Sequence, residues 1–355
     1  KLISYKFSLQ MTFAFAVLLL LFIPPLTLAK NARAEGPVPV VLWHGMGDSC
    51  CNPYSMGFIR KLILTNMPHA YVLSLQLGSS VAEDIGRGYF ANMNDEVAAV
   101  CQQLAEDARL ANGYNAIGFS QGALFVRALA QRCPYPPIRN LISIGGPQQG
   151  IFGLPFCPGS FYICSFIRRL LDNGAYTEFA QHNLVQAQYW HDPNLAEGYR
   201  RANIFLADVN CERSCDSTYR DNMAKLRNFV LVGFSNDHKL VPKETAWFGF
   251  YTDNDTQTIV PMEQTELYKQ DRIGLKTLNE SNRLHFLTFN GEHLQIPTDL
   301  FISEIVEKYL KEEIGEDKSD GSSSSSSSSE SAETSRETEE DEQIWGGKAR
   351  TDQSQ

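Results

Sequence analysis

Residues 114–133 read YNAIGFSQGALFVRALAQRC and contain the pentapeptide Gly118-Phe119-Ser120-Gln121-Gly122. A strand-like stretch precedes this G-x-S-x-G sequence, and a strong helical pattern follows it at once. A sharp turn between a strand and a helix is the nucleophile elbow, in which small residues at both glycine positions let the backbone bend and expose the serine hydroxyl. The pentapeptide alone is weak evidence, but in this context it predicts that Ser120 is a nucleophile.

On both sides of this segment, strand-like runs alternate with helical patterns. The run at 37–43, PVPVVLW, is apolar almost throughout, as in a strand buried on both faces of a parallel sheet. The other expected strands and helices are strands at 70–78, 114–120, 140–146, 228–234 and 283–289, and helices at 95–110, 121–132 and 299–313. This alternation predicts an α/β fold with a mostly parallel sheet and crossover helices. From about 148 to 226 the sequence becomes aromatic-rich and helical, which we interpret as a large insertion.

Composition and charge narrow the class of protein. The chain of 355 residues is 43% hydrophobic and 20% charged, which is typical of a globular protein and excludes a collagen-like repeat or a polytopic membrane protein. Residues 315–355 carry 11 acidic and 4 basic residues, a net charge of -7, so only -3 of the total of -10 belongs to residues 1–314. No basic stripe indicates a nucleic-acid partner. The Ser-rich acidic tail, 315–355, has almost no apolar residues besides Ile344 and Trp345, too few to offset the entropy lost on ordering, and we expect it to be disordered.

The first 34 residues resemble a secretory signal peptide. Phe13–Ile23 is an apolar stretch of 11 residues, too short for a bilayer core that needs about 20, but suited to the h-region of a signal peptide. Cleavage after Ala29 and cleavage after Ala34 are both compatible with the sequence, and an uncleaved anchor is the alternative. Residues 1–10 precede the first methionine, Met11, and are either upstream translated sequence or vector. We therefore expect one folded domain, residues 35–314.

Cysteines and sequons agree with a secreted route. Eight cysteines follow the apolar stretch, and an even number after a signal peptide indicates disulfides. Their spacing with histidine fits no zinc site, so we expect no metal and no cofactor. Asn254-Asp-Thr and Asn279-Glu-Ser are sequons for glycosylation, provided that they face solvent.

A serine nucleophile needs a base, and the base needs an orienting acid. With a nucleophile elbow the chain order is serine, acid, histidine, and the two partners lie on loops after later strands. His293 follows the run that ends at residue 289, whereas His285 lies within that run. Asp237 follows the run at 228–234 and is the favoured acid; Asp208, which ends the strand-like run NIFLAD, is the alternative. The acid would hold the imidazole in the tautomer that accepts the proton of the serine.

Two backbone amides are candidates for the oxyanion hole. The N–H of Gln121 lies at the expected start of the helix after Ser120, where an oxyanion is favoured. The second donor in such enzymes comes from the loop after the first core strand, which here reads His44-Gly45-Met46-Gly47-Asp48. We expect the Met46 N–H to be this donor and His44 to brace the loop through a hydrogen bond.

Longer motifs carry a family resemblance. They are HGMGDSCCNP (44–53), GYNAIGFSQG (113–122), QRCPYPPIRNLISIGGPQQG (131–150), YWHDP (189–193), WFGFY (247–251), YKQDRIGLK (268–276) and GEHLQ (291–295). With these motifs the chain resembles the lysosomal palmitoyl-protein thioesterases from about Val38 to Leu310. The resemblance implies an α/β-hydrolase with Ser120, Asp237 and His293 as its triad, and hydrolysis of palmitoyl thioesters on cysteine residues of proteins or peptides.

The resemblance also implies disulfides between Cys50 and Cys51, Cys101 and Cys133, and Cys157 and Cys164. Cys211 and Cys215 depart from the family pattern, but their spacing permits a local bridge, and the acidic tail is a second departure.

The alternatives for function are an acyl-CoA thioesterase or lipase of the same fold, and a catalytically silent binding protein. Expected partners are S-palmitoylated proteins or peptides, with no stable membrane span, and the expected location is the lysosome. Candidates for the acyl groove are the aromatic residues Phe152, Phe156, Phe161, Phe166, Phe179, Tyr189 and Trp190 of the insertion.

Overall fold

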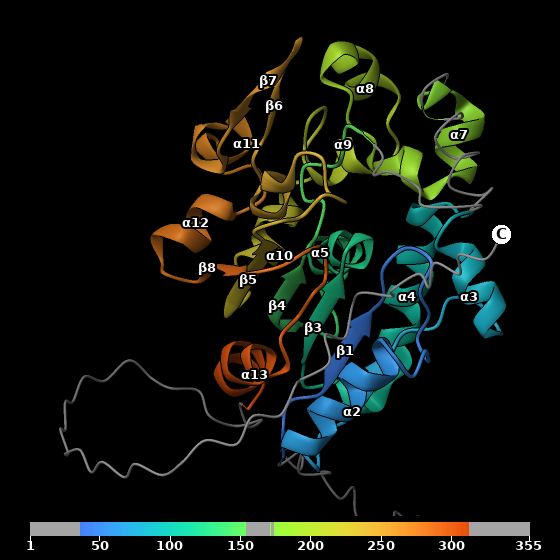
Figure 1. Ribbon diagram of the computed structural model, residues 1–355, viewed down its shortest axis with the longest axis vertical. Helices are drawn as coiled ribbons and strands as arrows, with labels where there is room; N and C mark the ends of the chain where they lie inside the picture. Colours follow the sequence, from blue (N-terminus) through green and yellow to red (C-terminus); the bar gives the residue numbers. More distant parts are fainter. Residues whose placement is uncertain (1–35, 154–170, 172–173, 312–355) are drawn as a thin grey trace, which may run out of the picture. The chain divides into compact units, whose positions relative to one another are not determined.

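A computed structural model describes residues 36–153, 171 and 174–311. Its centre is a six-stranded sheet in which every neighbouring pair is parallel, in the order β2-β1-β3-β4-β5-β8 (Figure 1). The strands are β1 (Val40–Trp43), β2 (Val72–Ser74), β3 (Tyr114–Phe119), β4 (Ile138–Ile144), β5 (Asn228–Phe234) and β8 (Leu284–Phe289). The predicted α/β fold with a parallel sheet is confirmed. The expected signal peptide, 1–34, and the expected tail, 315–355, lie outside the described residues.

Apolar side chains on both faces of the sheet explain its continuous hydrophobic runs. Along β1, Val40 and Leu42 belong to one buried cluster, and Val41 and Trp43 belong to another. The first cluster is covered by α2 (Met56–Asn66) and by the C-terminal helix, α13 (Thr298–Leu300) and η6 (Phe301–Leu310). The second is covered by α4 (Met93–Glu106) and α5 (Gln121–Arg132). The four central strands, β1, β3, β4 and β5, are therefore buried on both sides, as expected for a parallel sheet with crossover helices, whereas the edge strands β2 and β8 are partly exposed.

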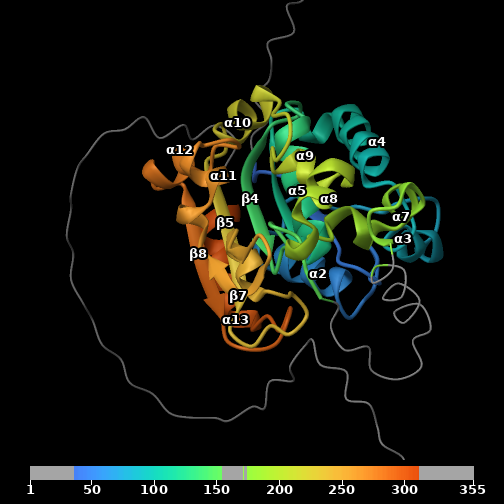
Figure 2. The ribbon, with the colours of Figure 1, turned by 90° about the horizontal axis from the view of Figure 1, so that it is seen from above.

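The regular elements described between β4 and β5 are all helices, joined by turns and loops, which agrees with the predicted helical insertion. Its elements are α7 (Glu178–Asn183), η2 (Val185–Tyr189), η3 (Pro193–Leu195), α8 (Ala196–Ala202), α9 (Leu206–Val209) and α10 (Ser217–Met223). Buried insertion residues such as Val185 and Phe205 join the cluster on the α5 face of the sheet. Arg127 and Gln131 of α5 both donate hydrogen bonds to the Val209 carbonyl oxygen at the end of α9 (Figure 2). The insertion thus extends the core on the side of the sheet that carries α5.

The strand-like run in the insertion does not form a strand. The run NIFLAD, 203–208, leads into the short helix α9 and not into a strand. The Asn203 side chain accepts hydrogen bonds from the N–H groups of Phe205 (3.1 Å) and Ala207 (3.1 Å), and so supports the turn that begins this helix. Periodicity cannot distinguish a short buried helix from a short buried strand.

Between β5 and β8 the structure adds elements that we did not predict. They are η4 (Lys243–Trp247), the antiparallel pair β6 (Phe250–Thr252) and β7 (Asp255–Val260), η5 (Met262–Gln264), α11 (Glu266–Lys269) and α12 (Leu275–Glu280). The remaining short helices are α3 (Val81–Arg87) and η1 (Ala108–Leu110). No helix among the described residues is long and apolar enough to cross a membrane.

Candidate active site

Ser120 lies at the turn between β3 and α5, with φ 53° and ψ -125°. Positive φ is uncommon for a residue other than glycine and here marks a sharp turn. A Cβ at Gly118 would lie 2.4 Å from the Cα of Ala123, and one at Gly122 would lie 2.4 Å from the carbonyl oxygen of His44. Neither position has room for a side chain, so the two glycines let α5 begin directly against β3 and β1. The turn has the strand–turn–helix geometry that the sequence predicts.

The structure brings Ser120, His293 and Asp237 together. His293 Nε2 lies 2.9 Å from Ser120 Oγ, and His293 Nδ1 lies 2.6 Å from Asp237 Oδ2. Ser120 follows β3, Asp237 follows β5 and His293 follows β8. Because these strands are parallel, their carboxyl ends meet at one edge of the sheet, and the three side chains converge there.

Asp237 sets the orientation of the imidazole. Its side chain is 5% exposed, and Oδ1 accepts hydrogen bonds from the N–H groups of Lys239 (2.8 Å) and Leu240 (3.0 Å). Burial raises the pKa of Asp237, but the hydrogen bond and charge of His293, together with the two backbone bonds, outweigh burial and lower the pKa below its usual value. The ionised carboxylate only accepts hydrogen bonds, so Nδ1 of His293 donates to it and Nε2 is left to accept from the Ser120 hydroxyl.

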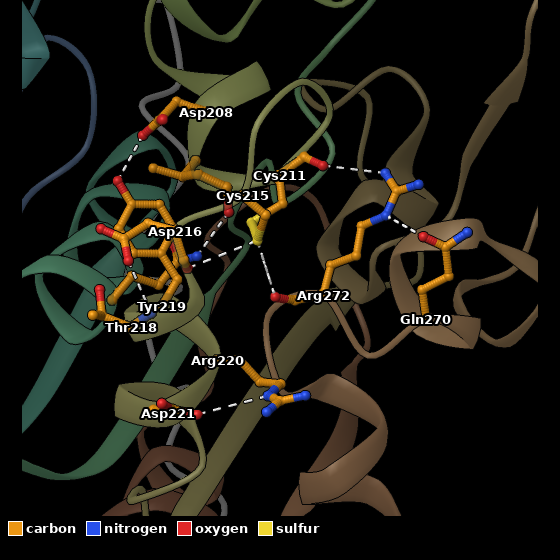
Figure 3. Close-up of a disulfide and its surroundings, with 12 residues drawn as sticks. Asp208, Cys211, Cys215, Asp216, Thr218, Tyr219, Arg220, Asp221, Gln270 and Arg272 are labelled. Carbon is orange, nitrogen blue, oxygen red and sulfur yellow. Dashed lines mark hydrogen bonds and ion pairs between the residues drawn. A yellow bond between two sulfur atoms is a disulfide. The ribbon is translucent and has the colours of Figure 1, made fainter.

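The two competing residues have other partners. Asp208 belongs to α9, and its Oδ2 accepts hydrogen bonds from Arg132 Nη2 (2.7 Å) and from the Tyr219 hydroxyl (2.7 Å; Figure 3). His285 lies in β8, with Nε2 2.8 Å from Asn228 Oδ1. None of the contacts described for these two side chains reaches Ser120 or the other triad candidates.

The loop after β1 passes directly against the nucleophile. A Cβ at Gly45 would lie only 3.1 Å from the Cβ of Ser120, so a side chain here would push the nucleophile or the loop aside by a few tenths of an ångström. Among the hydrogen bonds of the described residues, none uses the backbone N–H of Met46 or of Gln121. Gln121 is also the first residue of α5, where the helix dipole favours negative charge. Both amides therefore stay candidates for the oxyanion hole.

The side chain of Gln121 has a role that the sequence analysis missed. It is 2% exposed; Nε2 donates to the carbonyl oxygen of Gly88 (3.0 Å), and Oε1 accepts from the Tyr189 hydroxyl (3.1 Å). These bonds join the elbow to the segment after α3 and to the insertion. Because the partners lie 33 and 68 residues away in the chain, no local sequence signal could have revealed them.

A cavity of about 520 Å³ lies in the insertion. Two of its lining residues belong to segments that are hydrogen-bonded to the loops of Ser120 and Asp237. Phe152 and Trp190 are among the residues that line it, with ring centroids 5.7 Å apart. Trp190 follows Tyr189, whose hydroxyl donates a hydrogen bond to the side chain of Gln121, the residue after Ser120. The Phe152 N–H donates to the carbonyl oxygen of Val241 (2.7 Å), four residues after Asp237. The cavity wall is thus held by the same segments that hold the triad.

Of the aromatic residues expected to line an acyl groove, two line this cavity. Phe152 and Trp190 line the cavity, whereas Tyr189 is buried at 4% exposure and Phe179 is 67% exposed. Phe156, Phe161 and Phe166 lie outside the described residues. The other lining residues are Leu171, Gly174, Ala175, Tyr176, Thr177, Asp192 and Leu195.

Three cysteine pairs are joined within the described residues. They are Cys50–Cys51, Cys101–Cys133 between α4 and the end of α5, and Cys211–Cys215. The last pair lies beside Arg272, whose Nη1 donates to the carbonyl oxygen of Cys211 (3.2 Å; Figure 3). Cys157 and Cys164 lie outside the described residues, and their pairing stays a prediction.

The two sequon asparagines differ in their surroundings. Asn254 is exposed, at the turn between β6 and β7. Asn279 is half-buried in α12 and donates from Nδ2 to the Tyr268 hydroxyl (2.7 Å). Glycosylation at either position stays a prediction.

Comparison with known proteins identifies the family. The family described as palmitoyl protein thioesterase matches residues 39–293. Palmitoyl-protein thioesterase 1 of Caenorhabditis elegans is 54% identical over 291 residues, covering 82% of this chain and 98% of that protein. Palmitoyl-protein thioesterase 3 of Dictyostelium discoideum is 38% identical over 262 residues, covering 74% and 86%. Lysosomal thioesterase PPT2 of Homo sapiens is 30% identical over 269 residues, covering 75% and 85%. The chain belongs to the palmitoyl protein thioesterase family.

Proposed function

We propose that this protein hydrolyses palmitoyl and other long-chain fatty acyl thioesters on cysteine residues of proteins or peptides, with Ser120, His293 and Asp237 as its catalytic triad. The continuous hydrogen-bond chain from Asp237 through His293 to Ser120 carries the proposal. The membership of the thioesterase family supports the type of bond that is cleaved.

The first half of the reaction is acylation. Ser120 Oγ attacks the thioester carbonyl carbon while its proton passes to His293 Nε2, and the carbonyl electron pair moves to the oxygen. The N–H groups of Met46 and Gln121 donate to this oxyanion. When the tetrahedral intermediate collapses, the C–S bond breaks and the imidazolium gives its proton to the leaving thiolate. The products are the free cysteine thiol and an ester between the acyl group and Ser120.

The second half repeats these steps with water as the nucleophile. His293 takes a proton from water as the hydroxide adds to the ester carbonyl, and the same two amides stabilise the second oxyanion. Collapse releases the fatty acid and returns the proton to Ser120. Asp237 stays ionised throughout and stabilises the imidazolium that forms in each half.

The acyl chain supplies the binding energy that selects long substrates. Each buried methylene contributes about 0.8 kcal/mol, so an apolar wall near the triad favours long chains over short ones. The cavity lined by Phe152 and Trp190 has such a wall, and it is connected to the elbow through Tyr189 and to the Asp237 loop through Val241. We propose that this cavity receives part of the acyl chain.

The lysosome, reached through the secretory pathway, is the proposed location. Relatives with 30–31% identity are named lysosomal thioesterases. The paired cysteines suit an oxidising route, because disulfides are rare in the cytosol. Removal of residues 1–34 as a signal peptide belongs to the same proposal.

Hydrolysis of an S-palmitoylated peptide tests the proposed function. Wild type should release palmitate and free thiol, Ser120→Ala should be inactive but folded, and Ser217→Ala, an exposed serine at the start of α10, should match wild type. An active Ser120→Ala protein would contradict the mechanism. Faster turnover of palmitoyl-CoA or of a triglyceride than of the peptide would favour the alternative, an acyl-CoA thioesterase or lipase.

A further inference from the structure

Both ring nitrogens of His44 face oxygen atoms that can only accept hydrogen bonds. The imidazole is 1% exposed; Nε2 lies 3.0 Å from Asp84 Oδ1, and Nδ1 lies 2.9 Å from the carbonyl oxygen of Gly45. A carboxylate and a carbonyl provide no proton, so both bonds form together only when both nitrogens carry hydrogen. The arrangement is therefore fully satisfied only by the imidazolium form of His44.

Asp84 holds both ends of the loop that His44 begins. It lies in α3 and is fully buried. Besides binding His44, Oδ1 accepts from the Leu77 N–H (2.6 Å), and Oδ2 accepts from the Cys50 N–H (2.8 Å). His44 and Cys50 bracket residues 45–49, so one buried carboxylate fixes where this loop leaves β1 and where it ends.

The bond from His44 to Gly45 reaches the peptide unit that carries the Met46 amide. The Gly45 carbonyl and the Met46 N–H belong to one planar peptide group, in which oxygen and hydrogen point in opposite directions. Holding the oxygen therefore fixes the direction of the N–H. The Asp48 N–H also reaches the Gly45 oxygen, but at 3.3 Å. The shorter bond, from the His44 side chain, is the stronger restraint on this peptide plane.

We propose that His44, held by Asp84, is a positioning residue that aims the Met46 N–H at the oxyanion, and that it does so most effectively at acidic pH. This inference rests on the proposed thioesterase function and adds to it a second, pH-dependent histidine. His44 touches no substrate atom in this scheme. It acts through the peptide between Gly45 and Met46.

The groups around His44 make its protonated form favourable in the fold. Two carboxylates act on His44: Asp84 from α3 and Asp48 from its own loop. The other segments packed nearby contribute uncharged groups, namely the Leu77 N–H after β2 and Gly122 at the start of α5. Burial lowers the pKa of His44, but the bond and charge of Asp84, the Gly45 carbonyl and the charge of Asp48 together raise it above its usual value. His44 is therefore a cation in acid and loses its proton as pH rises through that raised value.

The test compares wild type with His44→Gln at pH 5 and pH 8, on a soluble palmitoyl thioester. We expect kcat of the variant to fall at least tenfold at pH 5 and less than threefold at pH 8, with KM unchanged at both. Any effect of pH that the two proteins share cancels in the ratio of wild type to variant. His285→Gln, in the half-buried edge of β8, is the matched control and should give a ratio near one at both pH values.

An inhibitor pair separates positioning from general damage. Ser120 adds to a palmityl trifluoromethyl ketone: the Oγ–C bond forms, the proton goes to His293 and the oxygen becomes an oxyanion. Palmitamide occupies the same site without forming one. His44→Gln should weaken binding of the ketone at least tenfold at pH 5 and leave binding of palmitamide unchanged.

Several results would overturn the proposal. They are a kcat ratio that does not change with pH, a loss confined to KM, and equal weakening of both inhibitors. If His44→Gln does not fold, Asp84→Asn serves in the same assays, because it removes the charge that keeps His44 protonated. If wild type fails to hydrolyse the thioester, the proposed function itself fails. An active wild type, an inactive Ser120→Ala and a flat ratio would reject only the positioning role.

Discussion

Replacing Asp237 by asparagine should inactivate the enzyme through the imidazole tautomer. Oδ1 of Asp237 accepts two backbone N–H bonds, whereas Oδ2 faces Nδ1 of His293 at 2.6 Å. The single oxygen of an asparagine can occupy only one of these positions. If it takes the Oδ1 position, the NH₂ group faces Nδ1 of His293, which must then accept. Nε2 carries the hydrogen in that tautomer and cannot take the proton of Ser120.

The structure also sets the size of the loss. The amide could instead turn its oxygen toward His293, but the NH₂ group would then face the N–H groups of Lys239 and Leu240. Each of these buried donors would lose its partner, at about 1–3 kcal/mol. The productive orientation is thus disfavoured by about 2–6 kcal/mol, and 1.36 kcal/mol corresponds to a factor of ten. We expect kcat to fall by between about 30-fold and about 3 × 10⁴-fold, a range that includes the loss of about 10⁴ known for this change in trypsin-like proteases.

Asp208→Asn is the matched control for this experiment. It makes the same change on a carboxylate with two strong bonds, to Arg132 and Tyr219, but in α9. Steady-state hydrolysis of a palmitoyl thioester, with circular dichroism to verify folding, should give kcat within twofold of wild type for Asp208→Asn. Near-normal activity of Asp237→Asn would refute the tautomer argument, and a large loss in Asp208→Asn alone would reassign the acid.

Three further predictions concern packing, a disulfide and pH. Gly122→Ala should lower the free energy of unfolding by more than about 3 kcal/mol, because the new Cβ would lie 2.4 Å from a backbone oxygen. Its control is Gly86→Ala in α3, where a Cβ would meet no atom within 4 Å; this change should raise the free energy of unfolding by up to about 1 kcal/mol. Urea titration measures both values. Replacing Cys211 and Cys215 together by serine should cost about 2 kcal/mol, from loop-closure entropy for a ring of about five residues, and leave kcat unchanged. Because the pKa of His44 is raised in the fold, its stabilising effect is complete below the unfolded value of about 6.5 and is lost as pH rises through the folded value. His44→Gln should therefore lower the free energy of unfolding more at pH 5 than at pH 8, and equal losses would contradict this linkage.

The centre of the sheet could be predicted from the sequence because its strands there are buried on both faces. Runs such as 37–43 and 228–234 are apolar almost throughout, and each contains a strand of the sheet. The run NIFLAD has four consecutive apolar residues and is also strand-like, yet it leads into α9, because Asn203 supports a helical turn there. Hydrophobicity reports burial, and the hydrogen-bond partners that decide between helix and strand are not visible in a short apolar run.

The candidate triad could be predicted because its chemistry follows chain order. Asp237 and His293 stand just after strands, and the structure brings both to Ser120. Asp84 and the side chain of Gln121 could not be predicted in the same way. Asp84 meets His44 across 40 residues, and Gln121 meets Tyr189 across 68. Such support depends on tertiary contacts between segments that have no common pattern.

The two histidine–aspartate pairs described in this protein differ in the partner of the second ring nitrogen. That partner decides whether the hydrogen bonds are satisfied with one or with two protons on the imidazole. His293 has Asp237 at Nδ1 and a hydroxyl at Nε2; a hydroxyl can donate, so the pair is satisfied while the ring is neutral. His44 has Asp84 at Nε2 and the Gly45 carbonyl at Nδ1, and a carbonyl can only accept. One ring is thereby left with a free electron pair for Ser120, whereas the other is satisfied only as a cation. In the proposed mechanism, the same residue types thus provide the base that activates Ser120 and the support of the loop that carries the Met46 amide.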